Sequence, residues 1–256
     1  MLQIHAVKAF NDNYIWLLQS AENQDVLIVD PGDAGPVINF IEKNDLHPAA
    51  ILVTHHHNDH VGGIRRLDDL YDLPVFGPQR EHIKTVDTPL YAQADQQLHP
   101  SFPHFRVIDT PGHTPGHISY LVDDNLFCGD TLFAGGCGRL LGGTAEQLFD
   151  SLQKIKQLPD DTRIYCAHEY TLANLQFATA VDPTNNDLLE RLTKTEALRE
   201  QQIATVPSEL KVEKRTNPFL RCDDAAIKKA AEAYADQPLD SPLAVFKVLR
   251  AWKDGF

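Results

Sequence analysis

Four histidines and one aspartate lie within six residues of this chain, in the segment His55-His56-His57-Asn58-Asp59-His60. An apolar run, residues 50–53, precedes the segment, so the chain must leave a predicted buried strand straight into it. Imidazole nitrogens and carboxylate oxygens are ligands that suit zinc, iron and manganese. A His-rich scavenging tract or an accidental polar loop would have a similar composition. The His-x-His-x-Asp-His spacing puts successive donors on different sides of a loop, which favours a metal site.

Three further segments place residues of the same kind just after predicted strands. They contain His113, Asp130 and His168. One histidine at the end of a strand is more often a structural residue than a ligand. Four such segments in one chain are difficult to assign to chance, because loops at strand ends are where α/β proteins place functional residues. The sequence therefore predicts that distant segments share one metal centre.

Short apolar runs alternate with helical patterns over the first two-thirds of the chain, which predicts sheet covered by helices. The expected strands of this part are residues 14–19, 26–30, 50–53, 105–109, 118–122, 125–128 and 163–166. Its expected helices are residues 36–44, 62–71 and 145–156. After His168 we expect helices alone, over residues 171–180, 186–202, 224–235 and 243–253. This change predicts two domains, residues 1–169 and an α-helical domain of residues 170–256.

Composition narrows the classes of protein to which the chain can belong. Hydrophobic residues make up 43% of its 256 residues, enough for a sizeable core, and the formal net charge of −13 disfavours a nucleic-acid partner. No apolar run reaches the roughly 18 residues that a membrane span needs. Residues 1–10 show no secretory signal, and the four cysteines form no CxxC pair. We therefore expect a cytoplasmic protein with no membrane or nucleic-acid partner.

The histidine-rich segment and the three later segments, in this order, resemble the metallo-β-lactamase superfamily. Three more stretches, together with the helical tail, narrow the resemblance: Asn13–Trp16, Gly135–Arg139 and Cys166–Thr171. With these the chain is similar to the glyoxalase II family of hydroxyacylglutathione hydrolases. The resemblance implies an α/β fold, a four-layer αββα metallo-β-lactamase sandwich followed by a C-terminal all-α domain. It also implies that residues 1–169 are the catalytic domain and that residues 170–256 bind substrate.

The same resemblance implies two divalent metal ions per chain, zinc first, with iron or manganese as alternatives. The first ion would bind His55, His57 and His113. The second would bind Asp59, His60 and His168, and Asp130 would bridge both. Asp59 would also be catalytic, orienting a metal-bound hydroxide. His56 should point away from the ions, and His117 should support a ligand by hydrogen bonding.

Four residues are implied as contacts to the substrate: Arg139, Tyr170, Arg250 and Lys253. Arg250 and Lys253 are three residues apart, so they share one face of the last helix. Their positive charges would attract the carboxylates of a glutathione moiety on an otherwise acidic protein. Leu141 departs from the family, which often has Tyr or Phe there. Its presence removes one hydroxyl contact and leaves the range of acyl groups open.

The implied reaction is hydrolysis of S-lactoylglutathione, an S-2-hydroxyacylglutathione, to D-lactate and glutathione in methylglyoxal detoxification. A metal-bridging hydroxide would attack the thioester carbonyl. The expected partner is thus a small glutathione thioester, bound by a monomer. Alternatives within the same fold are a glutathione persulfide dioxygenase and a lactonase. The excess of acidic over basic residues disfavours a nuclease. A metal-binding protein without catalysis is a third class.

Overall fold

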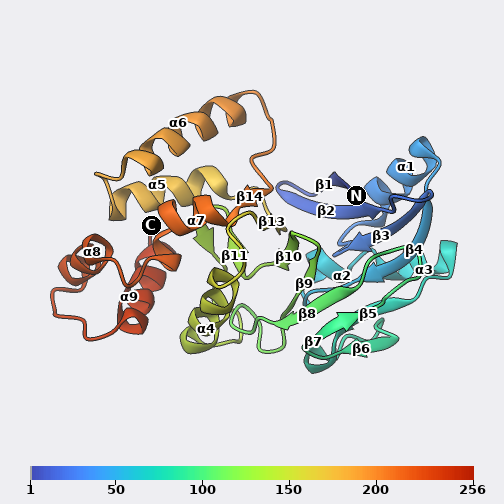
Figure 1. Cartoon of the computed structure of the whole chain (residues 1–256), viewed down its shortest axis with the longest axis horizontal. Coiled ribbons are helices and arrows are strands. Elements are labelled where there is room, and N and C mark those ends of the chain that lie inside the picture. The colour runs from blue at the N-terminus through green and yellow to red at the C-terminus, as the bar shows by residue number, and fades with distance from the viewer. Residues whose placement is uncertain (1) are drawn as a thin grey trace. The chain divides into compact units, whose positions relative to one another are not determined.

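The computed structural model describes residues 2–256, with only the backbone considered at positions 93 and 94 (Figure 1). Its contacts divide the chain into two compact units. The first comprises Met1–Thr110 with Gly116–Gly129, and the second comprises Pro111–Pro115 with Asp130–Phe256. No helix in the described part of the chain is both long and apolar enough to cross a membrane.

The first unit contains a six-stranded mixed sheet in the order β1-β2-β3-β4-β5-β6. Its strands are β1 (Gln3–Ala9), β2 (Asn13–Gln19), β3 (Asp25–Val29), β4 (His47–Leu52), β5 (Val75–Pro78) and β6 (Thr88–Leu90). Neighbouring strands are antiparallel from β1 to β3 and parallel from β3 to β6. The helices of this unit are α1 (Ala34–Asn44), α2 (Asn58–Val61), α3 (Ile64–Tyr71) and the short η1 (Gln79–Glu81).

The core of the first unit lies between this sheet and the helices α1 and α3. Alternate residues of β2, Ile15 and Leu17, pack in one cluster with Val37 and Ile41 of α1 and Leu67 of α3. Fully burying each such side chain stabilises the fold by roughly 1.5–3 kcal/mol. The other face of β2 is buried too, as expected for a sheet covered on both sides.

Four further strands of the first unit, β7 (Gln93–Gln96), β8 (Phe105–Asp109), β9 (Ile118–Val122) and β10 (Asn125–Gly129), pair in chain order, each antiparallel to the next. Tyr120 on β9 is fully buried, and its hydroxyl donates to the carbonyl of Val53 at 2.7 Å. That contact joins this antiparallel sheet to the chain just after β4. The segment that starts at Thr54 therefore leaves the protein core from between two sheets.

The second unit is mainly helical. It contains the strands β11 (Leu132–Phe133), β12 (Gly136–Cys137), β13 (Arg163–Cys166) and β14 (Ser208–Glu209). Its helices are α4 (Ala145–Lys156), α5 (Thr171–Val181), α6 (Asn186–Glu200), α7 (Leu210–Thr216), η2 (Pro218–Leu220), α8 (Ala225–Ala235) and α9 (Pro242–Asp254). Polar caps define where they begin: Thr144 and Gln147 form a capping box on α4, and Ser241 caps α9 just before a proline.

The prediction that no strand follows residue 168 is wrong. The two-residue strand β14 pairs antiparallel with β13. A strand this short shows no alternation of polar and apolar residues, so no pattern could reveal it. The helix α7, which follows it directly, is only 7 residues long and was missed for the same reason.

Candidate metal centre

Asp30, at the end of β3, organises the histidine-rich segment of the first unit. Its buried carboxylate accepts hydrogen bonds from the backbone N–H and the hydroxyl of Thr54, both at 2.7 Å. It also accepts one from Nδ1 of His60 at 3.0 Å. A histidine whose Nδ1 proton is held by a carboxylate offers its other nitrogen, Nε2, to a metal ion. Asp30 therefore selects the ring orientation of His60.

Asp59 is held by a side chain that lies 46 residues earlier in the chain. The amide Nδ2 of Asn13, at the start of β2, donates to Oδ2 of Asp59 at 3.0 Å. The backbone of the same segment packs on Gly32, where an added Cβ would lie 1.8 Å from the carbonyl oxygen of Asp59. Only glycine fits at that position. The turn at residues 30–32 is thus built around the histidine-rich segment.

His56 and His117 occupy different surroundings. The ring of His56 is 46% exposed and hydrogen-bonds the buried carboxylate of Glu81, which also accepts from the backbone N–H of Gly116 at 2.7 Å. His117 is buried, its Nδ1 lies 3.0 Å from the hydroxyl of Thr110, and its ring stacks on that of His55. Among the residues that the structure describes, neither belongs to a group of side chains that could hold a metal ion.

In the second unit, Asp130 lies between two imidazoles. Its Oδ2 is 3.4 Å from Nε2 of His113 and 3.5 Å from Nε2 of His168. Nδ1 of His113 donates to the carbonyl of Arg139 at 2.8 Å, and the ring of His168 stacks on Tyr170. All three ligand-type side chains are less than 10% exposed. A carboxylate between two imidazole nitrogens suits a bridging ligand.

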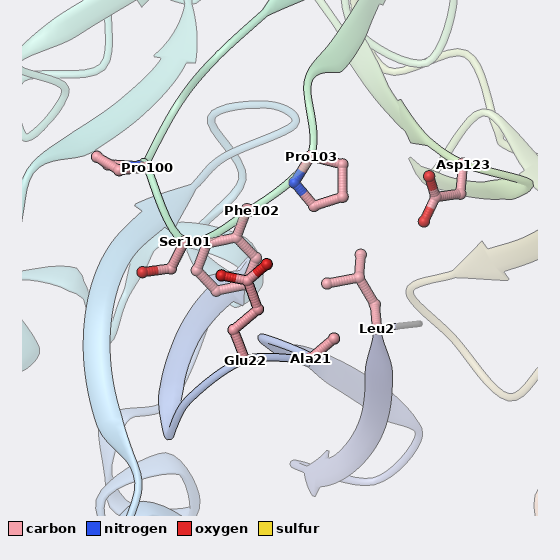
Figure 2. Close-up of a pocket in the computed structure, with 8 residues that line it drawn as sticks. All are labelled: Leu2, Ala21, Glu22, Pro100, Ser101, Phe102, Pro103 and Asp123. Carbon is pink, nitrogen blue, oxygen red and sulfur yellow. The ribbon is translucent and has the colours of Figure 1, made fainter.

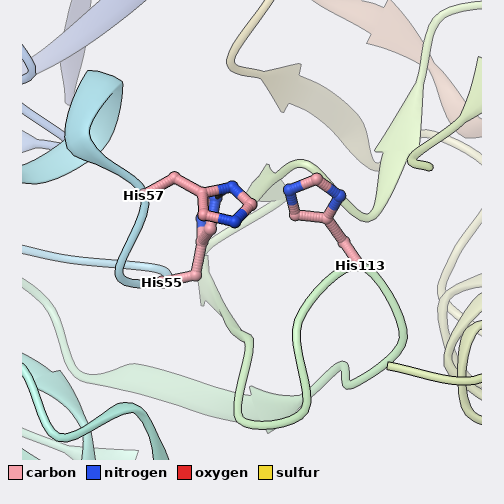
Figure 3. Close-up of side chains that lie close together, drawn as sticks. All are labelled: His55, His57 and His113. Carbon is pink, nitrogen blue, oxygen red and sulfur yellow. Dashed lines mark hydrogen bonds between the residues drawn. The ribbon is translucent and has the colours of Figure 1, made fainter. Parts of the chain in front are cut away.

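Three groups of side chains have the composition and spacing of metal sites. They are His55, His57 and His113; His55, His60 and Asp130; and Asp59, His60 and His168. Within each group one donor atom per residue lies within 4.8 Å of the others, and Figure 3 draws the side chains of the first group. The seven side chains predicted as ligands are the members of these groups.

The donor distances are those that a divalent cation requires. Four ligands about 2.1 Å from a tetrahedral ion lie about 3.4 Å from one another. Nε2 of His60 is 3.5 Å from Oδ2 of Asp59, and the two contacts of Asp130 are similar. Five imidazoles and two carboxylates form a donor set for zinc, iron or manganese rather than for calcium or magnesium.

The four residues predicted to contact substrate lie in the second unit and differ in exposure. The side chain of Arg139 is 70% exposed, and Tyr170 is 38% exposed beside His168. Lys253 is half-buried, and its Nζ donates to the carbonyl of Ala173 at 3.0 Å. Burial lowers the pKa of its ammonium, and the charges of Arg250 and Arg139 lower it further. Arg250 is only 4% exposed and bonds backbone carbonyls.

Two other features have no part in this centre. The Cys137 thiol is buried, which raises its pKa to about 11, so it is protonated near neutral pH and a poor nucleophile.

The pocket in Figure 2, about 290 Å³, is lined by residues of the first unit, none of them predicted for the site. They are Leu2, Ala21, Glu22, Pro100, Ser101, Phe102, Pro103 and Asp123.

Sequence patterns missed the residues that hold the ligands. The sequence pattern assigns Asp30 only to the end of a predicted strand, and it assigns Asn13 only to a stretch that resembles the family, without a role. Glu81 had no signal at all. Asp30 and His60 are 30 residues apart, and Asn13 and Asp59 are 46 apart, so no local spacing could connect them.

Asp30→Asn is expected to weaken metal binding about 10–100-fold, because the amide cannot accept the hydrogen bonds of both Thr54 and His60. Competition with a chromogenic chelator measures this affinity. Asp33→Asn is the matched control in the same turn, since Asp33 caps α1 and asparagine caps equally well. An Asp30→Asn protein that binds metal as tightly as this control would contradict the role of Asp30.

Two family models match the chain. The metallo-β-lactamase superfamily model matches residues 10–168, and the model of the hydroxyacylglutathione hydrolase C-terminus matches residues 169–256. A protein of Shewanella halifaxensis named hydroxyacylglutathione hydrolase is 50% identical over 258 residues, covering 100% of both chains.

Solved structures are also similar. The BLEG-1 B3 metallo-β-lactamase has a TM-score of 0.64 at 25% identity, covering 86% of this chain and 99% of its own. The structure of TTHA1623 in a di-iron-bound form has a TM-score of 0.59 at 25% identity, covering 85% of this chain and 100% of its own.

Proposed function

Because the chain belongs to the hydroxyacylglutathione hydrolase family of the metallo-β-lactamase superfamily, we propose that it hydrolyses S-lactoylglutathione to D-lactate and glutathione. Related S-2-hydroxyacylglutathiones would react in the same way, and the activity would serve methylglyoxal detoxification. The observation that carries the proposal is the set of three donor groups that together contain all seven ligand-type side chains. Full-length identity of 50% to a named relative supports it.

We propose the following organisation for the active protein. Residues 1–169 form the catalytic domain and residues 170–256 the substrate-binding domain, in line with the residues that the two family models match. The protein would act as a cytoplasmic monomer on a small glutathione thioester, without a nucleic-acid partner.

The seven side chains would hold two divalent cations. The ligands of one are His55, His57 and His113, those of the other are Asp59, His60 and His168, and Asp130 would serve both. Zinc is the first choice, and iron and manganese accept the same donors. The di-iron form of TTHA1623, a structure similar to this chain, supports two ions and keeps iron open.

Two bound cations would lower the pKa of a bound water towards ~7 and would polarise the carbonyl group of the substrate. The protein's own side chains orient the reaction. Asp59 is 40% exposed and fixed by Asn13 on one oxygen, so its carboxylate can orient the attacking water towards the thioester carbonyl. The histidines at positions 55 and 60 are buried and keep bulk water from one side of the site. The glutathione thiolate, with a thiol pKa of about 8.5, leaves without an acid.

Positive side chains of the second unit would bind the carboxylates of the substrate. Arg139 is exposed, and Lys253 is held in place by the carbonyl of Ala173 and by the rings of Phe177 and Phe256, 5.3 and 5.6 Å away. Tyr170 would line the acyl or thiol end of the site, next to His168. Arg250 would be the fourth substrate contact, because its buried Nε has no hydrogen-bond partner in the part of the chain that the structure describes.

Lys253→Ala is expected to raise KM for S-lactoylglutathione about tenfold with little change in kcat, since a charged hydrogen bond to bound substrate is lost. Steady-state kinetics measure both constants. Lys247→Ala is the matched control, because Lys247 lies on the same helix and pairs with Glu146 instead. An unchanged KM in Lys253→Ala would remove Lys253 from the binding site.

A substrate panel tests the proposed reaction. Thiol release from S-lactoylglutathione should greatly exceed turnover of a lactone or of glutathione persulfide. Oxygen uptake with the persulfide, without thiol release from the thioester, would favour the dioxygenase. Metal binding with no turnover of any of these compounds would favour a non-catalytic protein.

A further inference from the structure

Glu81, the last residue of η1, is a buried carboxylate that is not a member of the three donor groups. Its side chain is only 1% exposed. The short helix η1 directly follows β5, and β5 runs parallel to β4, so the two strands end at the same edge of the sheet. Because β4 leads into the histidine-rich segment, the fold places Glu81 beside that segment.

One oxygen of Glu81 bonds the histidine-rich segment between two predicted ligands. Oε2 accepts a hydrogen bond from the backbone N–H of His56 at 3.2 Å, and it also hydrogen-bonds Nδ1 of the His56 ring. His56 stands between His55 and His57 in the chain. The contact with the N–H group therefore fixes the backbone from which both of these side chains project.

The other oxygen of Glu81 holds the turn between β8 and β9. Oε1 accepts a hydrogen bond from the backbone N–H of Gly116 at 2.7 Å. Gly116 also packs closely on η1, where an added Cβ would lie 2.8 Å from the carbonyl carbon of Arg80. The next residue, His117, stacks its ring on that of His55, with the ring centres 4.9 Å apart. One carboxylate thus fixes the backbone of the ligand His55 and of the ring that packs on it.

We propose that Glu81 is a positioning residue for the ion bound by His55 and His57, and that it acts through the backbone N–H groups of His56 and Gly116. This inference rests on the proposed metal centre. Hydrogen bonds from N–H groups to a carboxylate are roughly twice as strong as those between neutral groups. Glu81 therefore holds two loops, from different sheets of the first unit, at a fixed distance from each other.

The other ion would depend much less on Glu81. Two of its predicted ligands, Asp59 and His60, are oriented by Asn13 and Asp30 through hydrogen bonds of 3.0 Å each. Loss of the Glu81 carboxylate should therefore weaken one ion and spare the other. The rival interpretation is that Glu81 only stabilises the fold, which would affect unfolding and leave the affinity of the folded protein for both ions unchanged.

Glu81→Gln separates the two interpretations, because the amide has one accepting oxygen and its NH₂ group would face an N–H donor. The chelator-stripped full-length protein is titrated with Co²⁺ and followed by its visible spectrum, which gives a binding constant for each ion. We expect one constant to fall about 10–100-fold and the other to stay at the wild-type value. His57→Ala removes a ligand of one donor group only, so it identifies the constant that should fall.

Three further variants test the route through the backbone. His56→Ala removes the ring but keeps the N–H group, so both constants should stay close to those of wild type. Gly116→Ala presses on η1 from the other loop and should reproduce the selective loss seen in Glu81→Gln. Asp87→Asn is the matched control, because Asp87 bonds the backbone N–H of Val75 at the opposite end of β5.

Two results would overturn the inference. The first is a Glu81→Gln protein that unfolds at lower urea concentration but binds both Co²⁺ ions as tightly as Asp87→Asn does. The second is a His56→Ala protein that loses as much affinity as Glu81→Gln, because the ring of His56 rather than the backbone would then be the group that Glu81 holds.

The wild-type protein distinguishes these results from a failure of the proposed function. A wild-type chain that binds fewer than two Co²⁺ ions would reject the two-metal centre. A wild-type chain that binds two ions but releases no thiol from S-lactoylglutathione would reject the proposed reaction. A wild-type chain that binds two ions and hydrolyses the thioester, while Glu81→Gln keeps both binding constants, would reject the role of Glu81 alone.

Discussion

Asp130→Ala is expected to lower kcat/KM for S-lactoylglutathione by about 10²–10³-fold, with loss of bound metal. Asp130 is 7% exposed and brings one carboxylate oxygen within 3.5 Å of the imidazoles of His113 and His168. No other carboxylate of the second unit belongs to the three donor groups. Its removal would leave the two proposed cations without the negative charge of a shared ligand. Initial rates and elemental analysis of the purified variant measure the two effects.

Asp124→Ala is the control for this substitution, because Asp124 is an exposed residue in the turn that leads into β10. It should keep full metal content and full turnover. Full metal content and wild-type turnover in Asp130→Ala would contradict the bridging role of this residue.

Glu213→Ala is expected to lower the free energy of unfolding by about 3–5 kcal/mol, because it leaves a buried charge without its partner. Arg191 lies 2.5 Å from the carboxylate, and its side chain is only 12% exposed. Hydrogen bonds from Ser208, from Asn217 and from the backbone of Gly135 are lost with it. Urea unfolding followed by circular dichroism measures the change.

The control for Glu213 is an exposed ion pair of the same region. Glu209→Ala removes a carboxylate 2.6 Å from Lys211, with both side chains about half exposed, and should cost no more than about 1 kcal/mol. Adding Arg191→Met to Glu213→Ala should recover part of the lost stability, because no charge is then left buried. A stability of Glu213→Ala within 1 kcal/mol of wild type would show that the pair is not needed.

Much of the fold could be predicted because its elements carry a strong periodic pattern. The strands β8, β9 and β13 and the helix α4 begin and end at the predicted residues. The predicted fold class is confirmed: the chain has the metallo-β-lactamase sandwich with a helical C-terminal region. The edge strand β1 was not predicted, because its residues alternate poorly between buried and exposed positions.

The surroundings of the site could not be predicted in the same way. Spacing placed Arg250 and Lys253 on one helix face, but spacing does not say what that face packs against. One carbonyl that Arg250 bonds belongs to Cys137, 113 residues earlier in the chain. A short motif is enough to identify a residue that could bind metal. The hydrogen bonds that orient such a residue come from residues elsewhere in the fold, which the motif does not contain.

The measurement that tests the central claim most directly is a metal titration of the chelator-stripped protein. Zinc is added in steps, and the rate of thiol release from S-lactoylglutathione is followed. Seven ligands for two ions predict a rate that is negligible without metal and stops rising at two equivalents per chain. Turnover without metal, or a rate that saturates at one equivalent, would contradict a two-metal hydrolase.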